Sequence, residues 1–519
     1  MRPTPLRILA IAAASIIAAA CGGKKEEAGK ATEPGAGGTD TDTGAGAGKD
    51  GEAPVAAPTS APTGTMAPGQ KAEPPAALPA DPGAKKAAHV WSRRMGGGEA
   101  ESGRAIAVAP DGSLYVSGMF RDEANFGEGK VVTANGTDAF VARVDAGGKT
   151  LWARGMGGEG DDIADAVAVS PTGSAVVAGS FSKQLVLGDS KMDSKGSDDM
   201  FVAEFDKEGR RLWARRFGGP DSDGVDGVAV DRAGNIALIG SYRSEMEVAK
   251  DDLFSGGDVD IALIMLAPDG TPKWGRGWGE MGPDEGRAVA FDKDGNLYVL
   301  VEFSRVVDFG GGKLQSGGNR DIGVIKLDPS GKHVWSRRFG GQLDELAVSL
   351  AVDDAGNAIL TGSFDDVLDF GDGAPLHTAG RSDVFVAKLG PDGSTRWAQK
   401  LGDTDEDIGA AVAVDAYGNV YAAGWFWKQI EVAGVAHKSK GKKDIFLAAF
   451  GPAGAPLWAR TFGDGEDDYG RGLAVDGAAI YATGTFHKTV NLGGDDLTAA
   501  VSKTPKIPYG DVFIAKWER

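Results

Sequence analysis

Cysteine is almost absent from this sequence, because Cys21 is the only one among 519 residues. A single thiol excludes a disulfide framework and a multi-thiolate zinc or iron–sulfur site. Positive charge is also scarce: 55 Lys and Arg stand against 74 Asp and Glu, for a net charge of −19. Phosphate neutralisation needs clustered cations, so we expect no nucleic-acid partner and no attraction to an anionic membrane surface.

Residues 1–20 have the pattern of an export signal. Two arginines precede the apolar run 8–20, which is shorter than the about 20 residues that a membrane-spanning helix needs, and small residues stand directly before Cys21. The segment resembles a bacterial lipoprotein signal, in which the cysteine is acylated. The resemblance implies a membrane anchor at Cys21. Because Gly22 follows, it implies the outer membrane, with the body in the periplasm or at the cell surface. An ordinary secretory signal cleaved near Ala20 is the alternative.

Residues 21–87 consist mainly of Ala, Gly, Pro and Thr with scattered charges. Such a segment lacks the large apolar side chains needed to offset the entropy lost on ordering. We therefore expect a disordered tether with an r.m.s. span of about 45 Å. The folded domain is expected over residues 88–519.

The remainder of the chain repeats a unit of about 61 residues seven times. Each copy carries a tryptophan, an acid ten residues later and a second acid at the start of a later strand. The tryptophans are Trp91, Trp152, Trp213, Trp274, Trp335, Trp397 and Trp458, and their successive spacings are 61, 61, 61, 61, 62 and 61 residues. The first set of acids is Glu101, Asp162, Asp223, Asp284, Glu345, Asp407 and Asp468, and the second is Asp138, Asp199, Asp260, Asp321, Asp383, Asp444 and Asp511.

Four short strands are predicted within each unit. In the sixth copy they cover residues 411–414, 420–426, 445–450 and 457–462, with glycine turns after the first and third and a longer loop after the second. A four-stranded antiparallel unit that must cover both faces by stacking on its neighbours is typical of a β-propeller. We expect an all-β fold, a seven-bladed β-propeller of four-stranded antiparallel blades.

The first strand of each unit alternates small residues with larger apolar ones, as at Ala411 and Ala413. Blades converge on a central axis, so the innermost strand must let the neighbouring sheet approach. The repeats begin with a lone fourth strand at 89–95 and end with a lone third strand at 512–517. We therefore predict that residues 89–95 complete the last blade.

The segments Asp383-Val-Phe-Val-Ala-Lys-Leu-Gly-Pro-Asp-Gly and Asp415-Ala-Tyr-Gly-Asn-Val-Tyr, with the Phe-Gly-Gly after the fourth strand, resemble the SBBP-type bacterial β-propeller repeat. The resemblance covers residues 88–519 and implies the fold but little about activity. The stretch 148–152 is also similar to the tryptophan-docking repeats of quinoprotein and outer-membrane-assembly propellers, which usually have eight blades.

The acids that recur in every copy have two interpretations. They are either calcium ligands or acceptors of backbone N–H groups within their own tight loops, and uniformity across the copies favours the second. Asp403, Asp405 and Asp407 begin like a calcium-binding loop, but Ile408 stands where a glycine is needed and no glutamate occupies the twelfth place. No cofactor is expected, apart from the calcium alternative.

Positions that differ between copies are better candidates for ligand binding. The first are charged residues at the entrance of the innermost strands, which either contact an anion or carbohydrate or pair with the neighbouring acids. The second are Trp425 and Trp427 on one side of a second strand, which either stack on a sugar or protein or pack against the loop 438–443. The charged candidates are Arg104, Arg287, Arg471, Asp165 and Asp226, and the corresponding positions in copies five and six are Val348 and Ala410.

No catalytic constellation is visible, because the five histidines share no register and no serine-elbow motif is present. We expect a monomeric, exported, lipid-anchored module that binds protein or glycan and is not an enzyme. The alternatives are a polysaccharide hydrolase or lyase that uses acids at the channel mouth, and a calcium-stabilised structural module. The longer, more varied connections should form the binding face.

Overall fold

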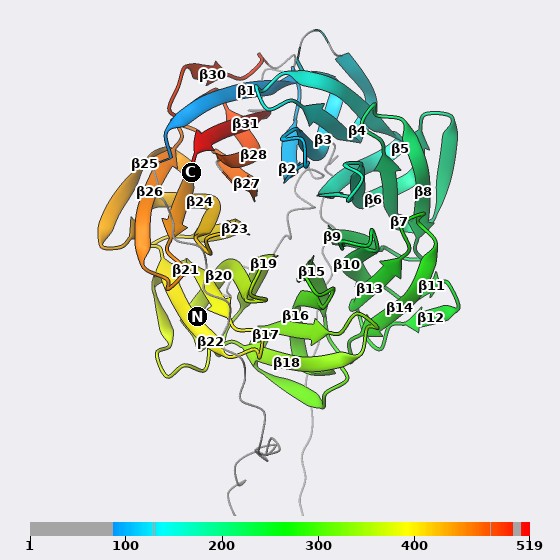
Figure 1. Cartoon of the computed structure of the whole chain (residues 1–519), viewed down its shortest axis with the longest axis vertical. Coiled ribbons are helices and arrows are strands. Elements are labelled where there is room, and N and C mark those ends of the chain that lie inside the picture. The colour runs from blue at the N-terminus through cyan, green and yellow to red at the C-terminus, as the bar shows by residue number, and fades with distance from the viewer. Residues whose placement is uncertain (1–86, 128, 130, 478, 502–509) are drawn as a thin grey trace, which may run out of the picture. The chain divides into compact units, whose positions relative to one another are not determined.

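The computed structural model describes residues 87–519, except 128, 130, 478 and 502–509. The expected signal, Cys21 and nearly all of the expected tether lie outside the described residues. All elements of the described part are β-strands, and no helix within it is long and apolar enough to cross a membrane. The predicted all-β, antiparallel and propeller-like architecture is confirmed at this level (Figure 1).

Four separate sheets have four antiparallel strands each, and in each sheet the strands lie side by side in chain order. They correspond to repeats 3, 4, 5 and 6 of the sequence. In repeat 3 an additional hairpin, β11–β12, lies between the second and third strands. The strands are β9 (Gly224–Val230), β10 (Ile236–Tyr242), β11 (Glu245–Val248), β12 (Asp251–Phe254), β13 (Asp260–Leu266), β14 (Pro272–Trp278), β15 (Glu285–Phe291), β16 (Leu297–Asp308), β17 (Lys313–Leu327), β18 (His333–Phe339), β19 (Glu345–Val352), β20 (Ala358–Leu368), β21 (Leu376–Leu389), β22 (Thr395–Leu401), β23 (Asp407–Val414), β24 (Val420–Val432), β25 (Val435–Phe450) and β26 (Pro456–Phe462).

The other strands, from repeats 1, 2 and 7, are linked into one hydrogen-bonded path. The long strand β5 joins repeats 1 and 2, because its first part pairs with β4 and its last part pairs with β6. These strands are β1 (His89–Gly97), β2 (Ser102–Val108), β3 (Leu114–Asn125), β4 (Val131–Val144), β5 (Thr150–Val169), β6 (Ala175–Leu187), β7 (Ser190–Phe205), β8 (Arg211–Phe217), β27 (Tyr469–Val475), β28 (Ala479–His487) and β31 (Gly510–Glu518). Repeat 7 also has a separate hairpin of β29 (Thr489–Asn491) and β30 (Asp496–Thr498).

The first strand of the folded part pairs with the last. Strand β1 lies antiparallel to β31, with Trp91 opposite Lys516 and Met95 opposite Val512. Strand β31 in turn pairs with β28, and β28 pairs with β27. The predicted pairing of residues 89–95 with the C-terminal strand is therefore present.

The innermost strands contact one another in the order β2, β5, β9, β15, β19, β23, β27, and β27 contacts β2 (Figure 1). Their close approach requires small side chains. A Cβ added to Gly472 of β27 would lie 3.2 Å from the Cα of Ala105 in β2. The small residues of the inner strands thus let successive sheets converge, as the sequence predicted.

Four of the repeated tryptophans donate a hydrogen bond to the neighbouring repeat. Trp335 of β18 donates from Nε1 to the carbonyl of Pro391, 2.9 Å away in the β21–β22 turn. Gly393 of the same turn has a φ of 77°, and a Cβ on it would press on the indole of Trp335. Each such hydrogen bond contributes about 1 kcal/mol. Equivalent bonds join Trp91 to Ala146, Trp152 to Lys207 and Trp397 to Pro452.

The connections between second and third strands differ from the expected loops. In repeats 1, 2, 4, 5 and 6 they are extensions of the strands themselves, and in repeats 3 and 7 they are separate hairpins. In repeat 6, β24 and β25 continue as a hairpin to a two-residue turn at Ala433 and Gly434, with φ values of 56° and 75°. Two positive φ values define a type I′ turn, which matches the twist of paired strands. The pairing is irregular at Lys428, which has a φ of 60°, because residues 439–442 of β25 have no paired partner in β24.

Candidate functional site

The non-uniform charged residues sit at a β-bulge in the innermost strands. In β27, Gly470 pairs with Gly484 and Gly472 pairs with Thr483, so Arg471 has no partner across the ladder. A bulge re-aims the extra side chain, which explains why these positions are free to vary. The equivalent residues are Arg104, Asp165, Asp226, Arg287, Val348 and Ala410.

Arg104 and Asp165 lie at neighbouring bulges and form a long ion pair. Their closest N···O distance is 4.0 Å, and only 8% and 11% of the two side chains are exposed. Burial raises the pKa of Asp165 to about 6, against the opposing charges of Arg104 and Arg471. Nε and Nη1 of Arg104 have no hydrogen-bond partner within the described part of the chain. The positive charge of Arg104 is therefore only partly balanced by a carboxylate.

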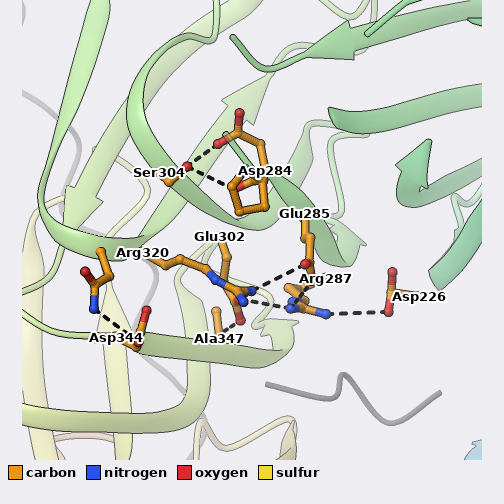
Figure 2. A network of polar contacts seen from close by, with 11 residues as sticks. Asp226, Asp284, Glu285, Arg287, Glu302, Ser304, Arg320, Asp344 and Ala347 are labelled. Carbon is orange, nitrogen blue, oxygen red and sulfur yellow. Dashed lines mark hydrogen bonds and ion pairs between the residues drawn. The ribbon is translucent and has the colours of Figure 1, made fainter. Parts of the chain in front are cut away.

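Arg287, by contrast, is the centre of a buried ionic network (Figure 2). Its side chain is 5% exposed, lies 2.8 Å from Glu302 and 3.9 Å from Asp226, and contacts Glu285. Arg320 of β17 lies 3.3 Å from Glu285 and 3.4 Å from Glu302. Two guanidinium groups thus share three carboxylates.

This network also joins two sheets. Glu302 of β16 accepts a hydrogen bond of 2.9 Å from the backbone N–H of Ala347 in β19 of the next repeat. Burial raises the pKa of Glu302, although Arg287 opposes the shift, and burial raises the pKa of Asp226 to about 8. Arg287 thus pairs with neighbouring acids, the alternative to ligand binding in the sequence, and Asp226 is one of them. The network also links repeats 4 and 5.

Arg471 lacks such compensation. Among the described residues no carboxylate forms an ion pair with it, and its buried Nε has no hydrogen-bond partner. Its guanidinium lies 5.1 Å from the ring centroid of Tyr469 and 5.5 Å from that of Trp425, distances typical of cation–π contacts. Burial, together with the charge of Arg104, lowers the pKa of Arg471 to about 9.

Trp425 and Trp427, the two tryptophans singled out in the sequence as ligand-binding candidates, have different surroundings. Trp425 is half-buried, its ring lies edge-on to Tyr469 at 5.3 Å, and its buried Nε1 has no partner in the part of the chain described. Trp427 is 39% exposed. Lys443 lies 5.9 Å from the Trp427 ring and 5.7 Å from the Tyr469 ring. We refer to Trp425, Trp427, Lys443, Tyr469 and Arg471 as the Arg471 cluster.

The carboxylates considered for a metal do not gather around a common point. Asp403 accepts from Gln429, Asp405 accepts from Lys428 at 2.9 Å, and Asp407 accepts from the backbone N–H of Asp403 at 3.1 Å. Over the described ranges, no group of three or more His, Cys, Asp or Glu is placed to hold a metal ion. The three aspartates thus serve the protein's own hydrogen bonding.

The acids that recur in every copy mostly accept hydrogen bonds from their own loops, as the structural interpretation predicted. Asp468, for example, accepts from the backbone N–H groups of Asp464 and His487 at 3.1 and 3.0 Å. The same loop contact exists for Asp162, Asp223, Asp284, Glu345 and Asp407. The strand-opening acids Asp199, Asp260, Asp321, Asp383 and Asp444 accept from the residue four positions earlier.

Sequence reasoning missed Glu285, Glu302 and Arg320, and also Tyr469 and Lys443. A signal existed for Glu302, because it occupies the same place in its second strand as Trp425. The other copies have Met119, Ser180, Ser241, Ser363 and Thr485 there. Comparing each second-strand position across the copies would have found both departures. The contact between Tyr469 and Lys443 depends on how β25 and β27 pack together, which the sequence does not indicate.

A cavity of about 790 Å³ opens at the opposite end of the inner strands, near the turns that follow β2, β5, β9 and β27. Its lining is mainly small or apolar, including Val108, Ala109 and Pro171, with few charged groups. The Arg471 cluster lies instead on the side of the longer connections.

No family model matches the chain. It is 27% identical over 364 residues to regulatory protein FlaEY of Caulobacter vibrioides, covering 63% of this chain and 37% of that protein. It is 23% identical over 262 residues to an uncharacterised WD repeat-containing protein, L264, of Acanthamoeba polyphaga mimivirus, covering 42% of this chain and 19% of that protein. The chain thus spans well under half the length of both relatives.

Among solved structures, Sqt1 from Chaetomium thermophilum is 11% identical with a TM-score of 0.40, over 82% of this chain and 98% of that one. A Bacteroides uniformis protein provisionally named as a 6-phosphogluconolactonase is 13% identical with a TM-score of 0.38, over 76% and 98% of the two chains. Similarity at this level carries no argument about activity.

Proposed function

We propose that this chain is an exported, lipid-anchored, seven-bladed β-propeller that acts as a non-enzymatic binding or scaffolding module for protein or glycan at the cell envelope. The proposal assigns residues 1–20 as the signal, Cys21 as the lipid attachment site in the outer membrane, and residues 88–519 as propeller blades of the SBBP type.

Two observations support a closed seven-bladed arrangement. The contacts between innermost strands run from β2 to β27 and return to β2. Strand β1 supplies the outer strand that repeat 7 lacks, and Trp91 donates to the Ala146 carbonyl of repeat 1 at 3.0 Å. Trp152, Trp335 and Trp397 make the equivalent contact with their neighbouring repeats. Dividing the long hydrogen-bonded path at β5 and between β1 and β3 yields blades 7, 1 and 2.

The observation that carries the binding function is Arg471, a partly buried cation without a carboxylate partner among the described residues. Withdrawing a charge from water is costly unless it is paired. Folding alone gives no reason to keep such a group, whereas a ligand that approaches Trp425 and Trp427 does. Most of the recurrent acids accept hydrogen bonds from backbone N–H groups of their own loops, so they are not left without partners among the described residues as Arg471 is.

The test is recovery of envelope partners by the full-length chain after cross-linking, compared with the double variant Trp425→Ala plus Trp427→Ala. We expect the double variant to lose the bound protein or glycan, since aromatic anchors dominate binding energy in most interfaces. The matched control is Phe254→Ala on the β11–β12 hairpin, a side chain that is 67% exposed and belongs to another repeat. Equal recovery by all three proteins would contradict a binding role for this face.

One observation favours the hydrolase or lyase alternative: burial raises the pKa of Asp226 to about 8, which suits a general acid. Asp226 is nevertheless placed beside Arg287 in the network of repeat 4. We expect no cleavage when the chain is incubated with acidic and neutral polysaccharides. Release of reducing ends that disappears in Asp226→Asn would instead establish the enzyme.

A further inference from the structure

Near Arg471, two buried arginines share one carboxylate, so a bound anion would balance the remaining positive charge. Arg471 and Arg104 both act on a single carboxylate, Asp165, which lies at the edge of ion-pair distance from Arg104. In repeat 4, two arginines of similar burial are matched by three carboxylates. Nε of Arg471 and two nitrogens of Arg104 are buried and have no hydrogen-bond partner among the described residues. Nε of Arg287 lacks a partner as well, so the two regions differ in the number of carboxylates that surround their arginines.

The rings around Arg471 indicate that the missing anion is attached to an apolar body. Trp425 and Tyr469 flank the guanidinium, and Trp427 exposes 39% of its surface two residues farther along the same side of β24. A sugar ring has a C–H face that packs on an indole, and a uronic acid adds a carboxylate on the same ring. Arg471 binds such a planar carboxylate well because its guanidinium donates two parallel N–H bonds.

A row of lysines extends from the cluster along β25. Lys438, Lys440 and Lys442 are exposed. They lie where the pairing of β25 with β24 is interrupted, between the pair Gln429–Lys438 and the pair Trp427–Lys443. Lys442 lies 2.9 Å from Glu466, but Lys438 and Lys440 form no ion pair with any described residue. Such a row is unusual in a chain with a net charge of −19, and it suits an extended polyanion better than a single small acid.

We propose that the Arg471 cluster and the lysines of β25 bind a polyuronate, a polysaccharide that carries carboxylates on its sugar rings. The inference rests on the proposed binding function and specifies its ligand. Arg471 holds one carboxylate, Trp425 and Trp427 pack against sugar faces, and Lys438 and Lys440 attract the next charged units. An acidic protein segment lacks the ring face, and a lipid bilayer surface is too flat to reach the buried nitrogens of Arg471.

The test measures binding of the full-length chain to immobilised polygalacturonate, with dextran as the uncharged comparison. We expect retention on polygalacturonate only. Arg471→Met should weaken binding about tenfold or more, as expected when a charge-assisted contact is lost. Arg471→Lys should restore part of it. The matched control is Arg337→Met, which removes an exposed guanidinium that stacks on Trp335 in a similar way, and it should leave binding unchanged.

A second measurement distinguishes a ligand site from a structural one. Because Arg471→Met removes an incompletely compensated charge, its melting temperature should equal or exceed that of the wild type while binding falls. Lys438→Ala plus Lys440→Ala should reduce the salt dependence of binding, since two cation contacts are removed. Lower stability of Arg471→Met with unchanged binding would overturn the proposal.

Other outcomes separate this inference from the proposed function. If polygalacturonate is not retained but envelope protein is cross-linked in a manner that depends on Trp425 and Trp427, the polyuronate proposal fails and the binding function stands. Equal binding to dextran, or binding to anionic phospholipid vesicles but not to polygalacturonate, also overturns it. If no envelope component and no polysaccharide binds, both proposals fail.

Discussion

Repeat 4 and the junction of repeats 6 and 7 each hold an arginine at the same place in an inner strand, but they surround its charge with different groups. Both place an arginine at the bulge of an innermost strand, Arg287 and Arg471, and both have an unusual residue in the adjacent second strand. In repeat 4 that residue is Glu302, which lies 2.8 Å from Arg287. At the junction it is Trp425, whose ring faces Arg471 without neutralising it. Carboxylates balance the charge of the first site, which joins two sheets, although Nε of Arg287 has no hydrogen-bond partner among the described residues. The second site has no carboxylate paired with its arginine in the described part of the chain.

The largest expected effect comes from breaking the charge-balanced site. Glu302→Ala removes the central acceptor of Arg287 and Arg320 and the partner of the Ala347 N–H. Leaving buried charges without compensation should cost about 3–5 kcal/mol in the free energy of unfolding, measured by urea denaturation.

Ser363→Ala is the control for Glu302→Ala, because Ser363 occupies the equivalent position in repeat 5 and is also buried. It should cost about 1 kcal/mol or less. Similar losses in both variants would show that the position, rather than the ionic network, matters.

The second prediction concerns pH and applies to both regions, because each lies next to a recurrent acid. Burial raises the pKa of Glu345 beside repeat 4 to about 9 and that of Asp468 beside Tyr469 to about 8. An acid whose folded pKa is raised binds its proton more tightly in the folded state. Its stabilising effect is complete below the unfolded pKa near ~4 and is lost as the pH rises through about 8 to 9.

The free energy of unfolding should therefore fall between pH 5 and pH 9, by about 1.4 kcal/mol per pH unit for each proton retained only in the folded state. Urea denaturation at several pH values measures the slope. Glu345→Gln and Asp468→Asn should each reduce it. A slope that is unchanged in both variants would assign the pH dependence to other groups.

The smallest expected effect contrasts the tryptophans of the same two regions. Trp335 in repeat 4 donates to Pro391 at 2.9 Å, whereas Nε1 of Trp458 in repeat 6 has no partner in the described part of the chain. Trp335→Phe should thus be less stable than Trp458→Phe by about 1 kcal/mol in thermal or chemical denaturation. Equal losses would mean that packing, rather than the hydrogen bond, accounts for the role of the repeated indole.

The periodic features of the fold were predictable, and the exceptions were not. The spacing of the tryptophans indicates the units, the small residues such as Ala411 indicate the inner strand, and the lone segments at 89–95 and 512–517 indicate their pairing, because each follows from seven copies of one pattern. A bulge adds a single residue to a strand without a compositional signal, so the reason for the variability at Arg471 required the strand register.

The candidate site was only half predicted for a related reason. Trp425 stands out because tryptophan is rare at its position, but its contacts with Tyr469 and Arg471 join different repeats. Glu302 appears in one copy only and looks like an ordinary surface acid until Arg287 and Arg320 are placed around it. Contacts between units depend on how neighbouring sheets are juxtaposed, which the internal periodicity of one unit does not specify.

The pairing of β1 with β31 has a consequence for how the molecule is made. Arg94 and Asp511, which contact each other across this pair, are 417 positions apart in the chain. During synthesis β1 emerges first but must wait for almost the whole remaining polypeptide before its partner exists, and until then it presents an unpaired strand edge. The final cooperative step of folding is therefore slow to begin, since contacts at such sequence separation form late. A product released before β31 would lack the partner of β1 and would leave that strand edge exposed.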